Sequence, residues 1–294
     1  MKKNIYITGS TGFVGKNIIT HFSNDFNFNI YNKYNSIKIL DAEVVLHFAG
    51  IAHDLKKSTN ILDYYKINTD LTKNIFDNFC TSNAKIFIFL SSVKAVSDNP
   101  KEILFEDFEP NPLTHYGKSK LLAEDYILSK PIIGTKKVYI LRPCMIHGPG
   151  NKGNLNLLYN FVKKGLPWPL AIYNNKRSYC SIGNLCFIIN ELINRNDIPS
   201  GIYNIADNDP ISTNELIKLI SLSLGKKDKY FNVPNLFIKA IAKIGNIFNL
   251  PFNSENIDKL TNSYVVSNSK LLNSIGTELP IKTKEGLILT FKTF

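Results

Sequence analysis

The sequence predicts an α/β protein with a doubly wound parallel sheet and a smaller C-terminal lobe. Three observations predict it: a glycine-rich turn after the first apolar run, apolar runs that alternate with helix-spaced segments as far as residue 143, and Gly-, Pro- and Asn-rich sequence after residue 148. At 294 residues and 44% hydrophobic content, the chain can bury a large core. The composition therefore excludes a disordered or fibrous protein.

The first element is a short apolar run at residues 3–8, followed by the turn GSTGFVG and a helix-spaced segment. Glycines permit a tight turn, and they let backbone N–H groups approach a pyrophosphate at the positive end of the helix. Gly9, Gly12 and Gly15 have the spacing GxxGxxG, a variant of the dinucleotide-binding pattern. This strand, turn and helix predict a Rossmann-type sheet.

The following elements continue a βαβ series. Strands are expected at 43–50, 85–92 and 137–143, with helical segments at 62–79 and 116–129 between them. Such a series gives a parallel sheet with right-handed crossovers, in which ligands bind beyond the carboxyl ends of the strands. The stretch between the first helix and the strand at 43–50 is short for two further βα units, so the sheet is expected to be shortened near residues 25–42.

The change of composition after residue 148 divides the chain into two parts. We assign residues 1–148 to an NAD(P)-binding domain, to which residues 178–206 return. Residues 149–177 and 207–294 form the expected substrate-binding lobe.

The charge balance of 35 Lys and Arg against 24 Asp and Glu gives a net charge of +11, which raises the question of an anionic partner. The lysines are spread along the chain, so we expect a solvated basic surface and no nucleic-acid partner. No apolar run reaches the roughly 20 residues that span a bilayer, and the N-terminus lacks a signal peptide, so we expect a cytoplasmic protein without membrane insertion. The four cysteines lack zinc-site spacing, and no metal is expected.

A catalytic group is predicted from two segments. Tyr116 and Lys120 are four residues apart on one helical face, where an ammonium stabilises a phenolate and lowers the pKa of the phenol. A phenol tuned in this way can exchange a proton with a sugar hydroxyl or ketone. Ser91 and Ser92 end the strand at 85–92, where a hydroxyl can hydrogen-bond to the same substrate oxygen.

The segments TGSTGFVG, HFAG, FLSS, YGKSK and LRPCMIHGPG together resemble the extended short-chain dehydrogenase/reductase family that modifies nucleotide sugars. The resemblance covers nearly the whole chain. It implies that Tyr116 transfers the proton and that Lys120 tunes it and holds the nicotinamide ribose. It further implies that Ser92, with Ser91 as the alternative, polarises the substrate oxygen.

The resemblance also implies contacts to a cofactor, NADP or NAD. The implied positions are Gly9, Thr11, Gly12, Phe13, Val14, Gly15, Asn32, Lys33, Ala49, Gly50, Asn68, Tyr116, Lys120 and Pro143. The second strand, within 26–32, lacks the terminal acidic residue that would bind a ribose 2′-OH. Lys33 could instead accept a 2′-phosphate, which favours NADP slightly, or lie in a solvated loop.

The second half of the chain resembles a subgroup of bacterial surface-polysaccharide enzymes on the segments GPGNKGNLNLL, GLPWPL, NNKRSYCSIGNL, VPNLFIKAIAKIG and YVVSNSKLLNSIG. These are UDP-N-acetylhexosamine 4-epimerases and the 4-keto reductases that make UDP-N-acetylquinovosamine. The resemblance implies that Arg177 pairs with the diphosphate of the UDP-sugar and that Asn154 contacts it from a helix start. The other expected substrate contacts are Ser92, Lys94 and His147. A homodimer through a helix pair that includes residues 115–130 is also consistent with the resemblance.

The residues after Ser92 exclude one branch of the family's chemistry. The related 4,6-dehydratases carry an Asp-Glu acid/base pair there, whereas this chain has Val93 and Lys94. Redox chemistry at C4 remains, and we expect 4-keto reduction of a UDP-(N-acetyl)hexosamine. The alternative is a 4-epimerase with tightly bound NAD, since both reactions use the same residues. A non-catalytic NADP-binding partner protein is a second alternative, against which the retention of Tyr116 and Lys120 argues.

Overall fold

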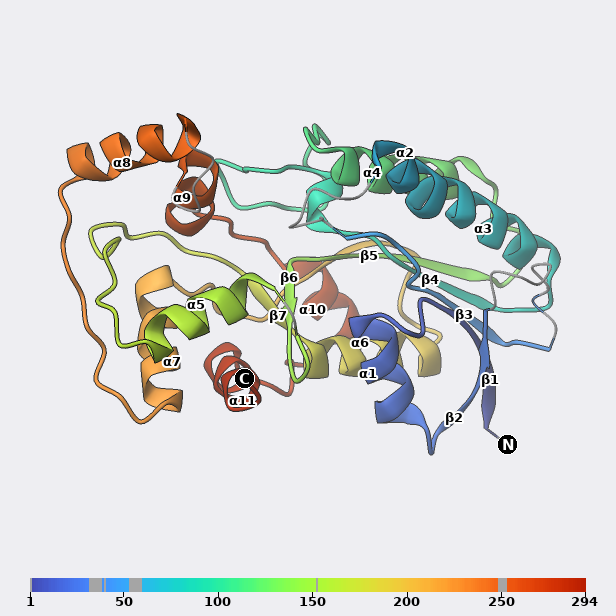
Figure 1. The fold of residues 1–294 in the computed structure, drawn as a ribbon. Helices are drawn as coiled ribbons and strands as arrows, with labels where there is room; N and C mark the ends of the chain where they lie inside the picture. The colour runs from blue at the N-terminus through green and yellow to red at the C-terminus, as the bar shows by residue number, and fades with distance from the viewer. Residues whose placement is uncertain (1, 32–38, 40, 53–59, 152, 248–252) are drawn as a thin grey trace.

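The computed structural model describes residues 2–31, 39, 41–52, 60–151, 153–247 and 253–294. Figure 1 shows two parts side by side: a parallel sheet with helices on both faces at the right, and a largely helical lobe at the left. The strands end where the two parts meet. Ligands of open parallel sheets bind at this edge, so the site is sought there.

The sheet has six strands in the order β2-β1-β3-β4-β5-β8, and every pairing is parallel. The strands are β1 (Lys3–Thr8), β2 (Phe26–Ile30), β3 (Val44–His47), β4 (Ile86–Leu90), β5 (Lys137–Pro143) and β8 (Gly201–Ile205). The predicted Rossmann-type parallel sheet is therefore confirmed. Among the described residues β2 is the outermost strand, and the chain next enters β3 on the opposite side of β1, which is the expected shortening near residues 25–42.

Alternation along each strand builds two cores, one on each face of the sheet. Ile5, Leu46 and Ile88 face α1 (Phe13–Phe22), α6 (Ile182–Asn194) and α10 (Ser269–Ile275). The intervening residues Val45, Phe87 and Phe89 pack with α3 (Leu71–Thr81) and α4 (His115–Ser129). Because both faces are covered, the strands read as nearly continuous apolar runs, which made them recognisable in the sequence.

The segment expected to be one helix at 62–79 is divided into three. A short α2 (Ile61–Tyr64) leads into a π-helical turn, η1 (Tyr65–Asp70), and then into α3. The π-turn adds one residue to the hydrogen-bonded ring, a feature that often occurs at functional sites. It carries Asn68, which is completely buried and faces α4.

The lobe forms a third core. It contains the two-stranded parallel sheet of β6 (Met145–His147) and β7 (Tyr179–Ser181), and the helices α5 (Asn154–Lys163), α7 (Thr213–Ser223), α8 (Asn235–Ile247), α9 (Ser254–Thr261) and α11 (Thr283–Phe291). Leu158, Trp168, Ile220 and Leu287 are among its buried side chains. Helix α10 instead packs against β8, with Leu271 in the core of the sheet. The exact domain boundaries stay a prediction.

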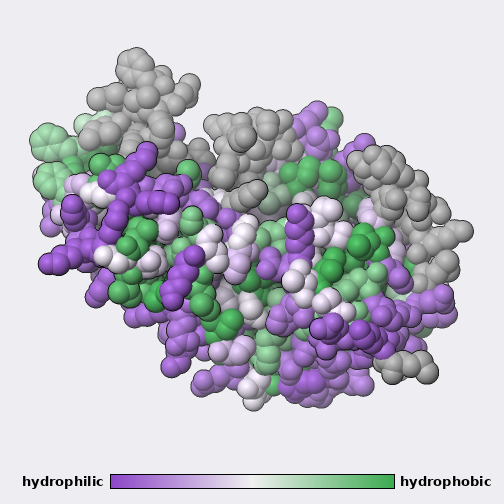
Figure 2. Space-filling view, turned by 60° about the horizontal axis from the view of Figure 1, so that its bottom comes forward, coloured by the Kyte–Doolittle hydropathy of each residue, from purple (hydrophilic) through white to green (hydrophobic). Residues whose placement is uncertain are grey.

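The surface mixes hydrophilic and apolar residues (Figure 2). On the face shown in Figure 2, hydrophilic residues cover both halves of the molecule between smaller apolar areas. Within the described ranges, no helix is long and apolar enough to cross a membrane.

A buried ion pair joins α4 to the central strand β5. The Nη2 atom of Arg142 lies 2.5 Å from Oε2 of Glu124, and its Nε donates to the same carboxylate at 3.0 Å. The Glu124 side chain is fully buried, and that of Arg142 is 3% exposed. A bidentate guanidinium–carboxylate pair in this setting fixes the position of α4, which carries the predicted Tyr116 and Lys120.

Replacing Glu124 by Gln should lower the free energy of unfolding by about 3–5 kcal/mol, because it leaves the Arg142 charge buried without a partner. Urea unfolding followed by circular dichroism measures this. The matched control is Glu109→Gln at an exposed position, which should change stability by no more than about 0.5 kcal/mol. A loss below about 1 kcal/mol in Glu124→Gln would show that the pair does not anchor α4.

Candidate functional site

The glycine turn forms a cradle that side chains would fill. Gly9 has a φ of +71°, and a Cβ there would lie 2.5 Å from the backbone nitrogen of Ala49. A Cβ at Gly15 would lie 2.3 Å from the carbonyl oxygen of Gly9. Helix α1 begins after Gly12, which has no side chain to cap the first-turn N–H groups. Thr11 and Gly12, which lead into this turn, are exposed, and uncapped N–H groups at a helix start fit a pyrophosphate.

A second loop, Ala49–Ile51, lies beside this cradle. The side chain of Asn68 accepts a hydrogen bond from the Ile51 N–H at 2.8 Å and donates to the Ile51 carbonyl at 3.1 Å. A Cβ on Gly50 would lie 3.0 Å from both the Asn68 Oδ1 and the Lys120 Nζ. Gly50 thus leaves this approach open, and its exposure makes the loop accessible to a ligand.

The remaining predicted cofactor positions divide into described and undescribed residues. Phe13 and Val14 lie in the first turn of α1 and are partly buried, and Pro143 is buried at the end of β5. Asn32 and Lys33 lie outside the described residues.

Lys120 on α4 is buried. Its ammonium donates to the Leu90 carbonyl at 2.9 Å and lies 4.8 Å from the centre of the Phe89 ring. Burial lowers the pKa of Lys120 to about 8, although the carboxylate of Glu124 opposes the shift. Leu90, the last residue of β4, thus holds the Lys120 ammonium beside the loop at Gly50.

Tyr116 begins the first turn of α4 next to Ser92. Burial raises the pKa of the Tyr116 phenol, a hydrogen bond with the Ser92 side chain opposes this, and Tyr64 adds to it. The sequence led us to expect that Lys120 would lower the pKa of Tyr116, and this expectation is wrong for the structure. The Lys120 ammonium is directed to the Leu90 carbonyl, so desolvation dominates at Tyr116 and the phenol is protonated at neutral pH.

The two serines at the end of β4 have different partners. Ser91 donates its hydroxyl hydrogen to Oε1 of Glu124 and is 3% exposed. Ser92 is the N-cap of the short η2 helix (Val93–Ala95) and reaches Tyr116. The structure therefore corrects the inclusion of Ser91 in the catalytic group, because its hydroxyl is bound to the buried Glu124 carboxylate and supports the ion pair.

Two cations from different segments, Lys94 and Arg177, lie near the ring of Tyr264. The Lys94 Nζ lies 4.5 Å from the ring centre, and the Arg177 guanidinium carbon lies 5.8 Å from it. Burial lowers the pKa of Lys94 to about 8; Asp98 opposes this shift, and the positive charges of Arg177 and Lys259 add to it. Cations that raise one another's energy in this way are stabilised by an anionic ligand.

Hydrogen bonds to backbone carbonyls hold the side chains of Arg177 and Lys94 in place. The Nη1 of Arg177 donates to the carbonyls of Lys259 and Asn262 at 2.8 and 3.0 Å. Lys94 donates to the Asp98 carbonyl at 2.6 Å. Asn154 is exposed at the first position of α5, as predicted. Its role as a substrate contact stays a prediction.

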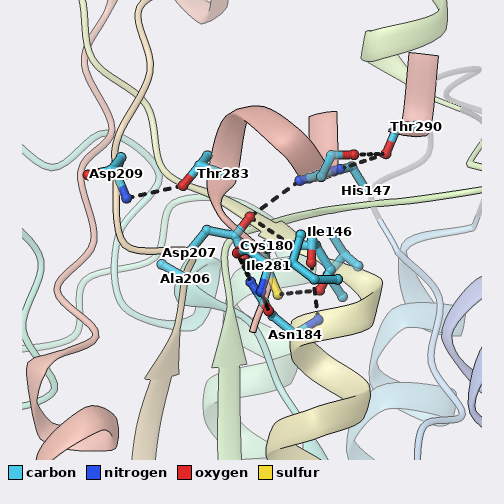
Figure 3. Close-up of polar contacts among 12 residues, drawn as sticks. Ile146, His147, Cys180, Asn184, Ala206, Asp207, Asp209, Ile281, Thr283 and Thr290 are labelled. Carbon is cyan, nitrogen blue, oxygen red and sulfur yellow. Dashed lines mark hydrogen bonds and ion pairs between the residues drawn. The ribbon is translucent and has the colours of Figure 1, made fainter. Parts of the chain in front are cut away.

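His147 does not line this site, which corrects its assignment as a substrate contact. Its side chain is completely buried between α11 and the end of β8 (Figure 3). The Nδ1 atom lies 2.9 Å from the Thr290 hydroxyl, and Nε2 lies 3.5 Å from a carboxylate oxygen of Asp207. Asp207 also accepts from the Asn184 side chain at 2.7 Å. His147 therefore joins β6 to the C-terminal helix α11.

Sequence reasoning missed Tyr264 and Lys259. Tyr264 donates its hydroxyl hydrogen to the Ser97 carbonyl at 2.6 Å, and its ring lies near the cations of Lys94 and Arg177. Burial raises the pKa of the Tyr264 phenol, and the nearby Asp98 adds to the shift. The partners of Tyr264 are far away in the sequence, and no local spacing marks it. The segment YVVSNSKLLNSIG, which begins with Tyr264, supported the family resemblance but did not single out this residue.

Comparison with known proteins identifies the class. A family model described as "NAD dependent epimerase/dehydratase family" matches residues 5–206, and the chain belongs to this family of enzymes. A UDP-glucose 4-epimerase from Vibrio cholerae is 29% identical over an alignment that covers 100% of this chain and 96% of the relative.

Two solved structures share the fold, each with a TM-score of 0.74. One is a UDP-glucuronic acid 4-epimerase from Bacillus cereus in complex with NAD, 17% identical, with 99% of this chain and 98% of that chain covered. The other is a dTDP-4-dehydrorhamnose reductase from Bacillus anthracis in complex with NADP, 18% identical, with 99% of each chain covered. Both likenesses show the same fold for this chain, in agreement with its membership of the NAD dependent epimerase/dehydratase family.

Replacing Tyr116 by Phe should lower kcat by about 10²-fold or more, because it removes the phenolic proton. Cofactor binding should change by less than about threefold, since the ring remains. The control is Tyr126→Phe on the same helix, whose hydroxyl bonds to Asp77 away from the site and whose loss should leave kcat within about twofold. Wild-type turnover in Tyr116→Phe would remove the phenol from the mechanism.

The rate should also depend on pH through Lys120. Its positive charge is present below pH 8 and is lost as the pH rises through about 8, whereas the raised pKa of Tyr116 keeps the phenol protonated there. We expect kcat to fall with an apparent pKa near 8. Lys94 titrates in the same range, so the profile is repeated with Lys94→Gln, in which the alkaline fall should persist. Its disappearance in that variant would assign the fall to Lys94.

Proposed function

We propose that the protein is an NAD(P)-dependent oxidoreductase that reduces the 4-keto group of a UDP-(N-acetyl)hexosamine during the biosynthesis of surface-polysaccharide sugars such as those of O-antigen or capsule. The observation that carries the proposal is the protonated Tyr116 phenol, which hydrogen-bonds to Ser92 just after the carboxyl end of β4. A phenol with a raised pKa is a proton donor, and ketone reduction needs one at the C4 oxygen.

The roles of the residues follow from their positions. Bound NADPH or NADH supplies the hydride for C4. The Tyr116 hydroxyl gives its proton to the C4 oxygen, and the Ser92 hydroxyl hydrogen-bonds to the same oxygen, so that a C4–H bond and an O–H bond form while the C=O double bond becomes single. The Lys120 ammonium, which lies beside Gly50, would hold the nicotinamide ribose.

The cationic group around Tyr264 supports a nucleotide-linked substrate. Arg177 has a planar fork that suits phosphate oxygens, and Lys94 lies two residues after Ser92. A diphosphate at Arg177 would place the attached sugar along Tyr264 toward Tyr116. A free hexose has no charge to match these cations, so a sugar diphosphonucleoside is the substrate class that we propose.

Epimerisation at C4 is the second candidate. The specific observation that favours it is the similarity, over the entire chain, to the Vibrio cholerae UDP-glucose 4-epimerase. An epimerase would use Tyr116 first as base and then as acid, and it would retain NAD through the cycle. The raised pKa of Tyr116 favours the acid role and hence the reductase.

The deciding experiment incubates the purified protein with UDP-N-acetylglucosamine, and separately with its 4-keto-6-deoxy derivative plus NADPH or NADH. Absorbance at 340 nm follows the cofactor, and NMR identifies the sugar products. Oxidation of the reduced cofactor with the ketone supports the reductase. Conversion to the galacto sugar without net cofactor change would show an epimerase instead of a reductase. No turnover in either assay would overturn both proposed activities on these substrates.

Replacing Arg177 by Met should raise the KM for the UDP-sugar by about 10- to 100-fold, because a charge-assisted contact to phosphate contributes about 1.5–3 kcal/mol. The expected change in kcat is below about threefold, since the guanidinium is remote from the reacting oxygen. Lys176→Met is the matched control: the neighbouring lysine is exposed, and its loss should leave KM within about twofold. An unchanged KM in Arg177→Met would place the diphosphate elsewhere.

A further inference from the structure

A chain of buried hydrogen bonds runs beneath the cofactor loop through His47, the last residue of β3. The Nδ1 atom of His47 lies 2.7 Å from the Thr8 hydroxyl, and Nε2 lies 2.8 Å from the Thr72 hydroxyl. The side chains of His47, Thr8 and Thr72 are 0% exposed. These three residues belong to β3, β1 and α3, so the chain joins two strands to the helix that covers them.

Counting donors and acceptors assigns the tautomer of His47. Thr72 donates its only hydroxyl hydrogen to the Asn68 carbonyl at 2.7 Å, so the contact to His47 requires that Nε2 carries the proton. Nδ1 is then an acceptor, and the Thr8 hydroxyl donates to it. The Thr8 oxygen in turn accepts from the Ala49 N–H at 3.1 Å. This is the only tautomer of His47 in which each donor of the chain meets an acceptor.

The two ends of this chain hold the loop Ala49–Ile51 from opposite sides. Thr8 binds the N–H of Ala49, whereas Asn68 binds both the N–H and the carbonyl of Ile51. Between them lies Gly50, where a Cβ would meet the side chains of Asn68 and Lys120. His47 links the two holding residues, because it bonds to Thr8 directly and to Asn68 through Thr72.

The surroundings keep the ring neutral, as the chain requires. Burial lowers the pKa of His47 to about 3, and the positive charge of Lys120 adds to the shift. The imidazole stacks on Phe89 with 5.6 Å between ring centres, and the ammonium of Lys120 lies 4.8 Å from the centre of the same Phe89 ring. A protonated ring would place two donors on Thr72 and Thr8 and would break the chain.

We propose that His47 is a positioning residue for the nicotinamide cofactor: its neutral, Nε2-protonated ring couples Thr8 to Thr72 and thereby sets loop Ala49–Ile51 and Asn68 against Lys120. The inference rests on the proposed function in one respect, namely that this loop contacts NAD(P). His47 itself does not touch the reacting atoms. It acts through the backbone of Ala49 and the side chain of Asn68.

The first test measures the affinity for NADPH and for NADH by the fluorescence of the reduced nicotinamide. Thr72→Val removes the acceptor for Nε2–H without changing the shape of the side chain, and Thr8→Val removes the donor to Nδ1. Each should raise the Kd of the better-bound cofactor about tenfold, the effect of one lost buried hydrogen bond. Thr72→Ser and Thr8→Ser, which keep the hydroxyl, should restore the Kd to within about twofold of the wild type.

The matched control is Thr290→Val. Thr290 also joins a buried histidine to a backbone carbonyl, since it contacts the His147 Nδ1 at 2.9 Å and donates to the Gly286 carbonyl at 2.9 Å. It lies on α11 in the C-terminal lobe. Its loss should lower Tm as Thr72→Val does and leave the Kd unchanged. Equal Kd values in the wild type, Thr72→Val and Thr290→Val would overturn the proposal, because a purely structural bond changes Tm alone.

The second test observes the ring directly in wild-type protein labelled with 15N-histidine. The His47 signals are those that move in both Thr8→Val and Thr72→Val. We expect a protonated Nε2, an unprotonated Nδ1, and no titration between pH 5 and 9. Protonation at Nδ1, or titration near the ordinary histidine pKa, would overturn the proposal. A wild type that binds neither NADPH nor NADH would overturn the proposed function, and with it the cofactor-positioning role, while the spectra would still report the tautomer.

Discussion

Burial of the parallel sheet on both faces is the constraint on which the rest of the structure depends. Because helices cover both faces, polar groups that meet a ligand can emerge only at the carboxyl ends of the strands. The glycine turn after β1, the loop after β3 and the serine pair after β4 all lie at this edge. Helix α4 must be held against the same edge, and the Glu124–Arg142 pair does this from inside the core.

Desolvation at that edge determines the protonation states of the candidate site. It lowers the pKa of Lys120, raises that of Tyr116, and keeps His47 neutral. Lys120 and His47 both contact the ring of Phe89. One apolar side chain of the sheet thus meets both a cation and a neutral imidazole. The same burial that stabilises the fold therefore also tunes the groups that we propose for catalysis.

The lobe contributes the charge that the sheet lacks. Tyr264 comes from the segment before α10, Arg177 from the segment before β7, and Lys94 from η2 at the sheet edge. Their arrangement gathers positive charge around one aromatic ring. This charge and the family relationship are consistent with the nucleotide-sugar substrate that we propose.

The sequence by itself determined the parallel sheet, its shortened edge, the glycine cradle and the position of Tyr116 and Lys120 on one helix. These features depend on local periodicity, on glycine stereochemistry and on spacing along one helix, all of which are written in neighbouring residues. Tertiary structure alone decided that Ser91 supports an ion pair, that His147 is buried, and that the pKa of Tyr116 is raised. It also decided that Tyr264 joins Lys94 and Arg177 and that His47 links Thr8 to Thr72. The physical reason is that burial and hydrogen-bond partners arise from segments far apart in the chain, so no local pattern contains them.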